Sequence, residues 1–381
     1  MAKKSNNGGA SSNKDDLIDL LQSELNKGNK DGGKIAYRLD EQDSPADITD
    51  WISTGSSILD LAISNRPLGG LPVGKMVEFN GLEGTGKSLL SAHVVADTQK
   101  KDGIAVVIDT ENAAAPEFWK SLGVNLSKLL YVQCETVEDI FEQMEKMIAI
   151  VRKSNKDRIL TIIVDSVAAA STKAELESEH GKDGYATGKS IIISKAMRKV
   201  TTMIGRQKVL IVFTNQLRQN LNAMAFGDKY IVSGGKALAY HCSVRVRLNN
   251  TGKLKKGEEI IGNECKAVVV KNRMGPPNRL ANFDIYYDSG IADYSSWIKV
   301  LKENNLIKQG GAYYTYQKVD GTEWKFQSKD FISTLQNDTN LKEEIYSKIC
   351  DAVIMKYKDP NSKIVEDAEV SSVEEDAGSE E

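Results

Sequence analysis

Long apolar runs are missing from this chain of 381 residues. The longest, such as Ile104–Ile108 and Ile159–Val164, are far shorter than the roughly 20 residues that a membrane-spanning helix needs. The N-terminus also lacks the apolar segment of a secretory signal, because Met1 is followed by alanine, two lysines and a run of serine, asparagine and glycine. We therefore expect no membrane partner and a cytoplasmic protein.

Cysteine and histidine are also scarce. The four cysteines, Cys134, Cys242, Cys265 and Cys350, lie far apart and form no Cys-x-x-Cys pair, and there are only three histidines. Structural zinc sites need closely spaced groups of these ligands, and disulfide frameworks belong mainly to small secreted proteins. The sequence argues against both, and we interpret the cysteines as reduced thiols in the core.

Positive charge is absent from the C-terminal end. No Lys or Arg follows Lys363, and eight of the 53 acidic residues lie after it, which leaves 45 acidic and 50 basic residues in the rest of the chain. The formal net charge of −3 therefore hides a basic body and an acidic tail. Such tails are usually solvated and disordered. The alternative is that the tail competes with a polyanion for the basic surface.

What remains is a globular composition, with 40% hydrophobic residues and a length that allows two or three domains. We divide the chain into a disordered start with one helix (1–34), an α/β core (35–290), a small C-terminal domain (291–357) and the acidic tail (358–381). The helix is predicted over Asp15–Lys27, where leucines and Ile18 recur at helical spacing. It packs either on its own domain or, as an oligomerisation helix, on a neighbouring subunit.

Strands and helices alternate through the core. We predict strands at 76–80, 104–109, 130–132, 159–164 and 209–214, helices at 87–101, 116–122, 137–152 and 189–204, and further strands at 243–248, 265–270 and 283–287. This alternation is typical of a mainly parallel sheet that is covered by helices. Residues 291–357 mix helices with short strands.

A complete phosphate-binding motif lies between the first of these strands and its helix. The motif is Gly81-Leu82-Glu83-Gly84-Thr85-Gly86-Lys87-Ser88, which matches G-x-x-x-x-G-K-[ST]. Its glycines let backbone N–H groups turn towards a phosphate, and the helix N-terminus adds partial positive charge. Lys87 is predicted to reach the β- and γ-phosphates of ATP, and the Ser88 hydroxyl to bind Mg²⁺.

Polar side chains follow three other predicted strands. Asp165 ends one strand and is typical of the carboxylate that holds Mg²⁺. Asp109 and Glu111 follow another, and either could deprotonate the attacking water. Gln216 follows a third and could sense the γ-phosphate. The carboxyl ends of parallel strands are where α/β sheets place their ligands.

Together these segments resemble the RecA family of homologous-recombination ATPases. The resemblance also rests on Ile52–Asp60, Gly69–Lys75, Val164–Ala169, Ala196–Lys199, Asn215–Arg218 and Val269–Arg273, and it extends roughly from Asp15 to Tyr357. It implies a RecA-like P-loop ATPase core. The diverged termini favour a phage-type, UvsX-like branch, whose members would work in the cytoplasm of the host.

The resemblance assigns roles to individual residues. It makes Glu111 rather than Asp109 the catalytic glutamate, and Gln216 the link between the γ-phosphate and DNA affinity. It implies that Lys271 and Arg273 reach the ATP of the adjacent subunit. Where the family usually has Asp and Tyr at the adenine side, this chain has Ala115 and Phe118, which lowers the expectation of base specificity. Asn112 replaces the histidine that usually follows the catalytic glutamate.

The resemblance also implies two DNA-binding loops, at Ser178–Lys189 and Arg218–Gly234. Both are rich in glycine and polar residues and interrupt the strand–helix pattern, so the sequence alone indicates mobile loops. The implied DNA contacts are Arg198, Arg218, Gly234 and Gly235. Phe226 either inserts between bases, as aromatic side chains do on single strands, or packs a loop end.

We therefore expect a DNA-dependent ATPase that uses ATP and Mg²⁺. The resemblance implies a helical filament on single-stranded DNA that tests homologous double-stranded DNA and exchanges strands, with loader or single-strand-binding proteins as further partners. The alternatives are a helicase-like DNA motor, a small-molecule kinase whose turnover ignores DNA, and a recombination mediator with a decayed ATPase. Intact Lys87, Ser88, Glu111 and Asp165 argue against decay.

Overall fold

The computed structural model describes residues 15–27, 34–39, 47–111, 115–167, 169–177, 185–205, 207–219, 230–232 and 236–357. The elements are, in chain order, α1 (Asp15–Lys27), β1 (Trp51–Ile52), α2 (Ser57–Ser64), β2 (Leu71–Pro72), β3 (Met76–Gly81), α3 (Lys87–Lys100), β4 (Ile104–Asp109), α4 (Pro116–Ser121), η1 (Leu126–Lys128), β5 (Leu129–Gln133), α5 (Val137–Ser154), β6 (Leu160–Asp165), α6 (Lys173–Glu177), α7 (Tyr185–Ile204), β7 (Val209–Gln219), β8 (Tyr230–Val232), α8 (Lys236–His241), β9 (Val244–Lys256), β10 (Glu259–Asn272), β11 (Arg279–Tyr286), β12 (Gly290–Ile291), α9 (Asp293–Glu303), β13 (Ile307–Gly310), β14 (Tyr313–Gln317), β15 (Glu323–Phe326), α10 (Ser328–Asn337) and α11 (Thr339–Val353).

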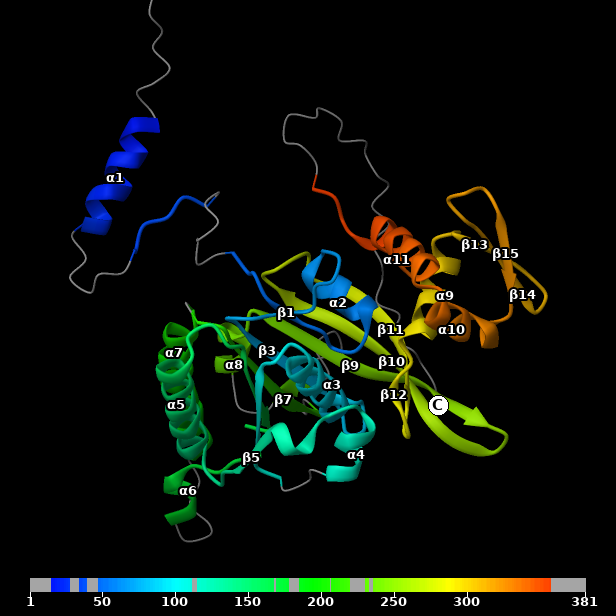
Figure 1. Ribbon diagram of the computed structural model, residues 1–381. Helices are drawn as coiled ribbons and strands as arrows, with labels where there is room; N and C mark the ends of the chain where they lie inside the picture. The colour runs from blue at the N-terminus through cyan, green and yellow to red at the C-terminus, as the bar shows by residue number, and fades with distance from the viewer. Residues whose placement is uncertain are drawn as a thin grey trace, which may run out of the picture.

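One large sheet organises the molecule (Figure 1). Its strand order is β12-β11-β10-β9-β3-β7-β6-β4-β5, and β8 pairs with β7. The strands from β9 through β3 to β5 are parallel neighbours, whereas β9 to β12 form an antiparallel meander. The predicted α/β class with a mainly parallel, helix-covered sheet is confirmed.

Alternating side chains give the sheet two apolar faces. On β3, Val77 and Phe79 join the cluster that includes α2, α3, α9 and α11, whereas Met76 joins the cluster with α5, α7 and α8. This is the two-residue period of a strand that is buried on both sides. All four cysteines are buried free thiols, as interpreted from the sequence.

The C-terminal elements form a smaller unit at one end of the molecule (Figure 1). The strands β13, β14 and β15 make a three-stranded antiparallel sheet beside α10 and α11. Phe326, Phe331 and Ile345 from this unit belong to the same apolar cluster as Val77 of the large sheet. The predicted boundary between residues 290 and 291 falls inside β12, and the division into domains stays a prediction.

Helix α1 has the predicted bounds and an apolar face that is open in the described structure. Leu17, Leu20, Leu21 and Leu25 are each 54–56% exposed. Figure 1 shows α1 apart from the large sheet. None of the described helices combines the length and the apolar character that a bilayer crossing requires.

Both predicted loops are partly wrong. Helix α7 begins at Tyr185 rather than at Lys189, so residues 185–189 are helical although they fall in the predicted first loop. Strand β7 continues to Gln219 and pairs with β8, so Arg218 lies in a strand. Strand β7 extends into the predicted loop because pairing with β8 satisfies backbone N–H and C=O groups that would otherwise bind water.

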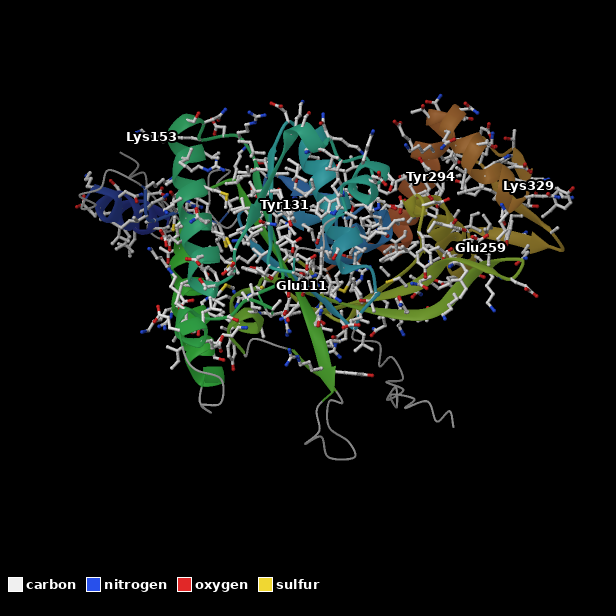
Figure 2. All side chains as sticks on the ribbon, turned by 90° about the horizontal axis from the view of Figure 1, so that it is seen from below. Glu111, Tyr131, Lys153, Glu259, Tyr294 and Lys329 are labelled. Carbon is white, nitrogen blue, oxygen red and sulfur yellow. The ribbon has the colours of Figure 1, made fainter. Side chains whose placement is uncertain are left out.

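The strands β9 and β10 are much longer than the predicted 243–248 and 265–270. They form a hairpin that projects beyond the body (Figure 1), and Glu259 lies near its turn (Figure 2). Gly257 makes this turn with φ +65°. The outer half of the hairpin is exposed and polar, so the apolar pattern marked only the half that lies in the core.

Candidate functional site

The phosphate motif joins the end of β3 to the start of α3, in the middle of the large sheet. Gly86 is the N-cap of α3 and has φ +94°, a conformation that favours glycine. A Cβ at this residue would lie 2.6 Å from Cδ1 of Ile285. The first turn of α3 therefore presents its N–H groups without a side-chain cap, which suits an anion such as phosphate.

The Lys87 ammonium lies against its own loop. Its Nζ donates hydrogen bonds to the carbonyl oxygens of Gly81 at 3.2 Å and Leu82 at 2.7 Å. Burial lowers the pKa of Lys87, and the charges of Asp165, Glu111 and Glu83 oppose that shift. The motif lysine is thus close to the acidic side chains that the sequence placed at the same sheet edge.

Ser88 and Asp165 are in direct contact. The Ser88 hydroxyl donates to Oδ2 of Asp165 at 2.7 Å, and Thr214 donates to Oδ1. A hydroxyl beside a carboxylate is a donor set that fits Mg²⁺, which prefers hard oxygen ligands. Sequence reasoning missed Thr214, which fixes the orientation of this carboxylate. In the sequence, only the position of Thr214 directly before Asn215-Gln216 indicated that it lies near the site.

The two rival acids differ in their surroundings. Asp109 is 4% exposed, and its two oxygens accept hydrogen bonds from the Glu111 N–H at 2.8 Å and the Tyr131 hydroxyl at 2.9 Å. Glu111 is exposed and accepts one bond, at 3.2 Å, from the hydroxyl of Ser166. Figure 2 shows Glu111 near the point where β7 leaves the body. The geometry therefore favours Glu111 as the base, with Asp109 holding its backbone.

Gln216 lies directly beside the phosphate motif. In the parallel pairing of β3 and β7, Asn80 faces Asn215 and Gly81 faces Gln216. Gln216 therefore lies on β7 at the edge of the phosphate site. From there β7 continues to Gln219, towards the predicted second DNA loop. This register could not be read from the sequence, and the role of Gln216 stays a prediction.

A cavity of about 250 Å³ opens beside the phosphate motif. It is lined by residues 84–89 together with Phe118, Asn263, Ile285 and Tyr287. The Tyr287 hydroxyl donates to Oδ1 of Asn263 at 3.0 Å. Ala115, the N-cap of α4, makes no side-chain cap bond. Asn263 and Tyr287 had no sequence signal, because they reach this cavity only through the pairing of β10 and β11.

This cavity predicts a role for Phe118 in base binding. Replacing Phe118 by Ala is expected to weaken ATP binding by about 1–3 kcal/mol, roughly 5- to 150-fold in Kd, through loss of a stacking surface. Titration with a fluorescent ATP analogue measures the change. Phe118→Tyr keeps the ring and serves as the control. Wild-type affinity in Phe118→Ala would place the base elsewhere.

Lys271 and Arg273 do not approach the phosphate motif of their own chain. Lys271 pairs with Arg245 of β9, whereas Gly81 pairs with Leu248, three residues further along that strand. The Nζ of Lys271 donates to the carbonyl oxygens of Ala239 at 2.6 Å and Tyr240 at 3.0 Å. Burial and the charge of Arg273 lower the pKa of Lys271. Both cations thus face a different surface from the chain's own ATP site.

The predicted DNA contacts fall into two groups. Arg198 is exposed on α7 and lies, with Lys271 and Arg273, around His241, whose pKa is lowered by burial and then by these three cations. Arg218 is exposed on β7 and contributes to lowering the pKa of Lys189, after burial. Phe226, Gly234, Gly235 and Asn112 lie outside the described residues, and all the DNA-contact assignments stay predictions.

Comparison with known proteins identifies related sequences over most of the chain. Residues 19–292 match the family described as the RecA N-terminal domain. The "Protein RecA" of Clostridium acetobutylicum is 36% identical over 350 residues, which cover 91% of this chain and 95% of that protein. The "Protein RecA" of Legionella pneumophila is 40% identical over 267 residues, covering 70% and 74%. That of Dichelobacter nodosus is 37% identical over 330 residues, covering 86% and 90%.

Proposed function

Because this chain belongs to the RecA family, we propose that it is an ATP-dependent recombinase that assembles as a helical filament on single-stranded DNA. The filament tests homologous double-stranded DNA by base pairing and exchanges strands. The recombinase and DNA-dependent ATPase activities follow from membership of the family. Three finer points stay predictions. They are loader or single-strand-binding proteins as partners, a UvsX-like branch, and a cytoplasmic location in a bacterium or phage host.

The observation that supports the mechanism is that Lys271 and Arg273 lie away from the phosphate motif of their own chain. One surface holds the phosphate motif with Glu111 and Asp165, and the other presents Lys271 and Arg273. In the proposed filament, the second surface of one subunit closes over the first surface of the next. Ser88 and Asp165 would hold Mg²⁺, which would neutralise phosphate charge when bound.

A head-to-tail interface whose rotation does not close produces an open helix of subunits. The open apolar face of α1 supports the neighbouring subunit as its docking partner, because its leucines are about half exposed in the described chain. Each subunit then contributes a docking helix as well as cations to its neighbour.

ATP acts in this proposal as a switch of DNA affinity. Gln216 contacts the γ-phosphate and transmits its presence along β7 to the second loop. Hydrolysis with Glu111 as base removes that contact and weakens the grip on DNA. The switch needs only a difference in the DNA affinities of the two nucleotide states.

Strand exchange between circular single-stranded DNA and a linear duplex tests the function. With the full chain, ATP and Mg²⁺, joint molecules are expected with a homologous duplex and not with a heterologous one. Separation of both duplexes without regard to homology would instead support the helicase-like motor.

The acidic tail lies outside the described residues, and its effect stays a prediction from charge. Removing residues 364–381 is expected to tighten duplex DNA binding by about tenfold at low salt, because eight acidic charges no longer compete with phosphate. A full-length variant with amides in place of these acids is the matched control and should bind equally tightly. Unchanged affinity and salt dependence in both would contradict the idea.

A further inference from the structure

Glu78 is a buried carboxylate without a role in the mechanism above. It lies on β3, between β7 and β9, three residues before Gly81, and is 0% exposed. A buried charge is tolerated only when it is paired and hydrogen-bonded. The partners that Glu78 has therefore indicate which segments it holds in place.

Three strands supply these partners. Nε of Arg245 on β9 forms a short, charged hydrogen bond with Oε2 of Glu78. Nδ2 of Asn215 on β7 donates to Oε1 at 2.9 Å, and Nδ2 of Asn80 on β3 donates to Oε2 at 3.4 Å. A single carboxylate thus connects the three central strands of the sheet by side-chain contacts, in addition to their backbone pairing.

Each partner adjoins a different part of the ATP machinery. Asn80 directly precedes the phosphate motif, and Asn215 directly precedes Gln216. Arg245 is paired across the β9–β10 ladder with Lys271, one of the two cations proposed to act on the next subunit's ATP. The charges of Glu78 and Arg245 act on the pKa of Lys271 in opposite directions, Glu78 raising it and Arg245 lowering it.

We propose that Glu78 is a positioning residue that couples the chain's own phosphate motif and Gln216 to the cations that it offers to the neighbouring subunit. This inference rests on the proposed function, because it requires ATP sites shared between subunits. A shift of Asn215 when Gln216 meets a γ-phosphate moves the carboxylate against Arg245, and Arg245 then moves against Lys271. ATP bound by one subunit thereby affects how well that subunit completes the next site.

The test compares full-length wild type and Glu78→Gln in ATP hydrolysis on single-stranded DNA across a range of ATP concentrations. Wild type is expected to respond cooperatively to ATP. In Glu78→Gln, the Hill coefficient should fall towards one and the half-saturating ATP concentration should rise about tenfold, while the maximal rate changes less than about twofold. ADP binding without DNA should be unchanged, because Glu78 does not touch the nucleotide site.

Two further variants separate coupling from stability. Asp284→Asn removes another buried carboxylate of the same sheet, one that is paired with Lys299 at 2.7 Å, and should keep the wild-type Hill coefficient. Glu78→Asp keeps the charge and should recover part of the cooperativity, which also tests the proposal if Glu78→Gln fails to fold.

Four results would overturn the inference. Wild-type cooperativity in Glu78→Gln would exclude a coupling role. If only Glu78→Asp folds, wild-type cooperativity in that variant would exclude it. An equal loss of cooperativity in Asp284→Asn would also exclude it. If wild type itself hydrolyses ATP without cooperativity but with stimulation by DNA, this inference fails and the proposed function stands. If wild type does not respond to DNA, both fail.

Discussion

Replacing Glu111 by Ala is expected to slow DNA-dependent ATP hydrolysis by about 10²- to 10⁴-fold while ATP binding is retained. Glu111 is an exposed acid near the phosphate site, and its carboxylate accepts a hydrogen bond from the Ser166 hydroxyl at 3.2 Å. Its carboxylate can therefore turn towards a water beside the γ-phosphate. Steady-state hydrolysis and binding of a fluorescent ATP analogue measure the two effects separately.

Asp109→Asn is the comparison that identifies the base. Asp109 holds the Glu111 N–H and the Tyr131 hydroxyl, so this variant should lose part of its activity through misplacement of Glu111. The loss should be smaller than that in Glu111→Ala. The reverse order, with near-normal turnover in Glu111→Ala, would make Asp109 the base.

Replacing Lys271 by Ala is expected to abolish most DNA-stimulated hydrolysis without loss of the folded state or of ADP binding. The reason is that Lys271 lies away from its own phosphate motif and would act on a neighbour's ATP. Circular dichroism and ADP titration check the fold and the chain's own site. Turnover with single-stranded DNA reports on the shared site.

Mixing this variant with Lys87→Ala tests the sharing directly. Each variant alone should be inactive. In the mixture, the Lys271→Ala variant supplies an intact phosphate motif and the Lys87→Ala variant supplies an intact Lys271, so an interface between them forms a complete site. An equal mixture should regain about a quarter of the wild-type rate, the statistical share of such interfaces in a head-to-tail assembly. No recovery would show that Lys271 acts within its own chain.

The sequence predicted the parallel part of the fold well because its strands are buried on both faces. Such strands are continuous apolar runs, and the predicted bounds of 104–109 agree with β4. The antiparallel hairpin of β9 and β10 was predicted at less than half its length, since its outer half is polar. Helix α7 was predicted to start at Lys189 rather than Tyr185, because the glycine-rich and polar sequence before it was interpreted as a loop.

For the candidate site, local motifs predicted the phosphate loop and the acids at the strand ends. The residues that were missed at the site, Thr214, Asn263 and Tyr287, reach it only through strand register, and Glu78 meets its partners on neighbouring strands in the same way. Register is set by pairing between distant segments, which one sequence does not display. The residues alone left Asp109 and Glu111 open, because both follow the same apolar strand, and the family resemblance favoured Glu111.

ATP hydrolysis by the wild-type chain, measured with and without single-stranded DNA, tests whether DNA completes ATP sites that are shared between subunits. We expect low turnover without DNA and strong stimulation by DNA, since DNA aligns subunits so that Lys271 and Arg273 complete each ATP site. Hydrolysis that is equally fast with and without DNA would contradict it. Such a result would favour a P-loop enzyme with a small-molecule acceptor.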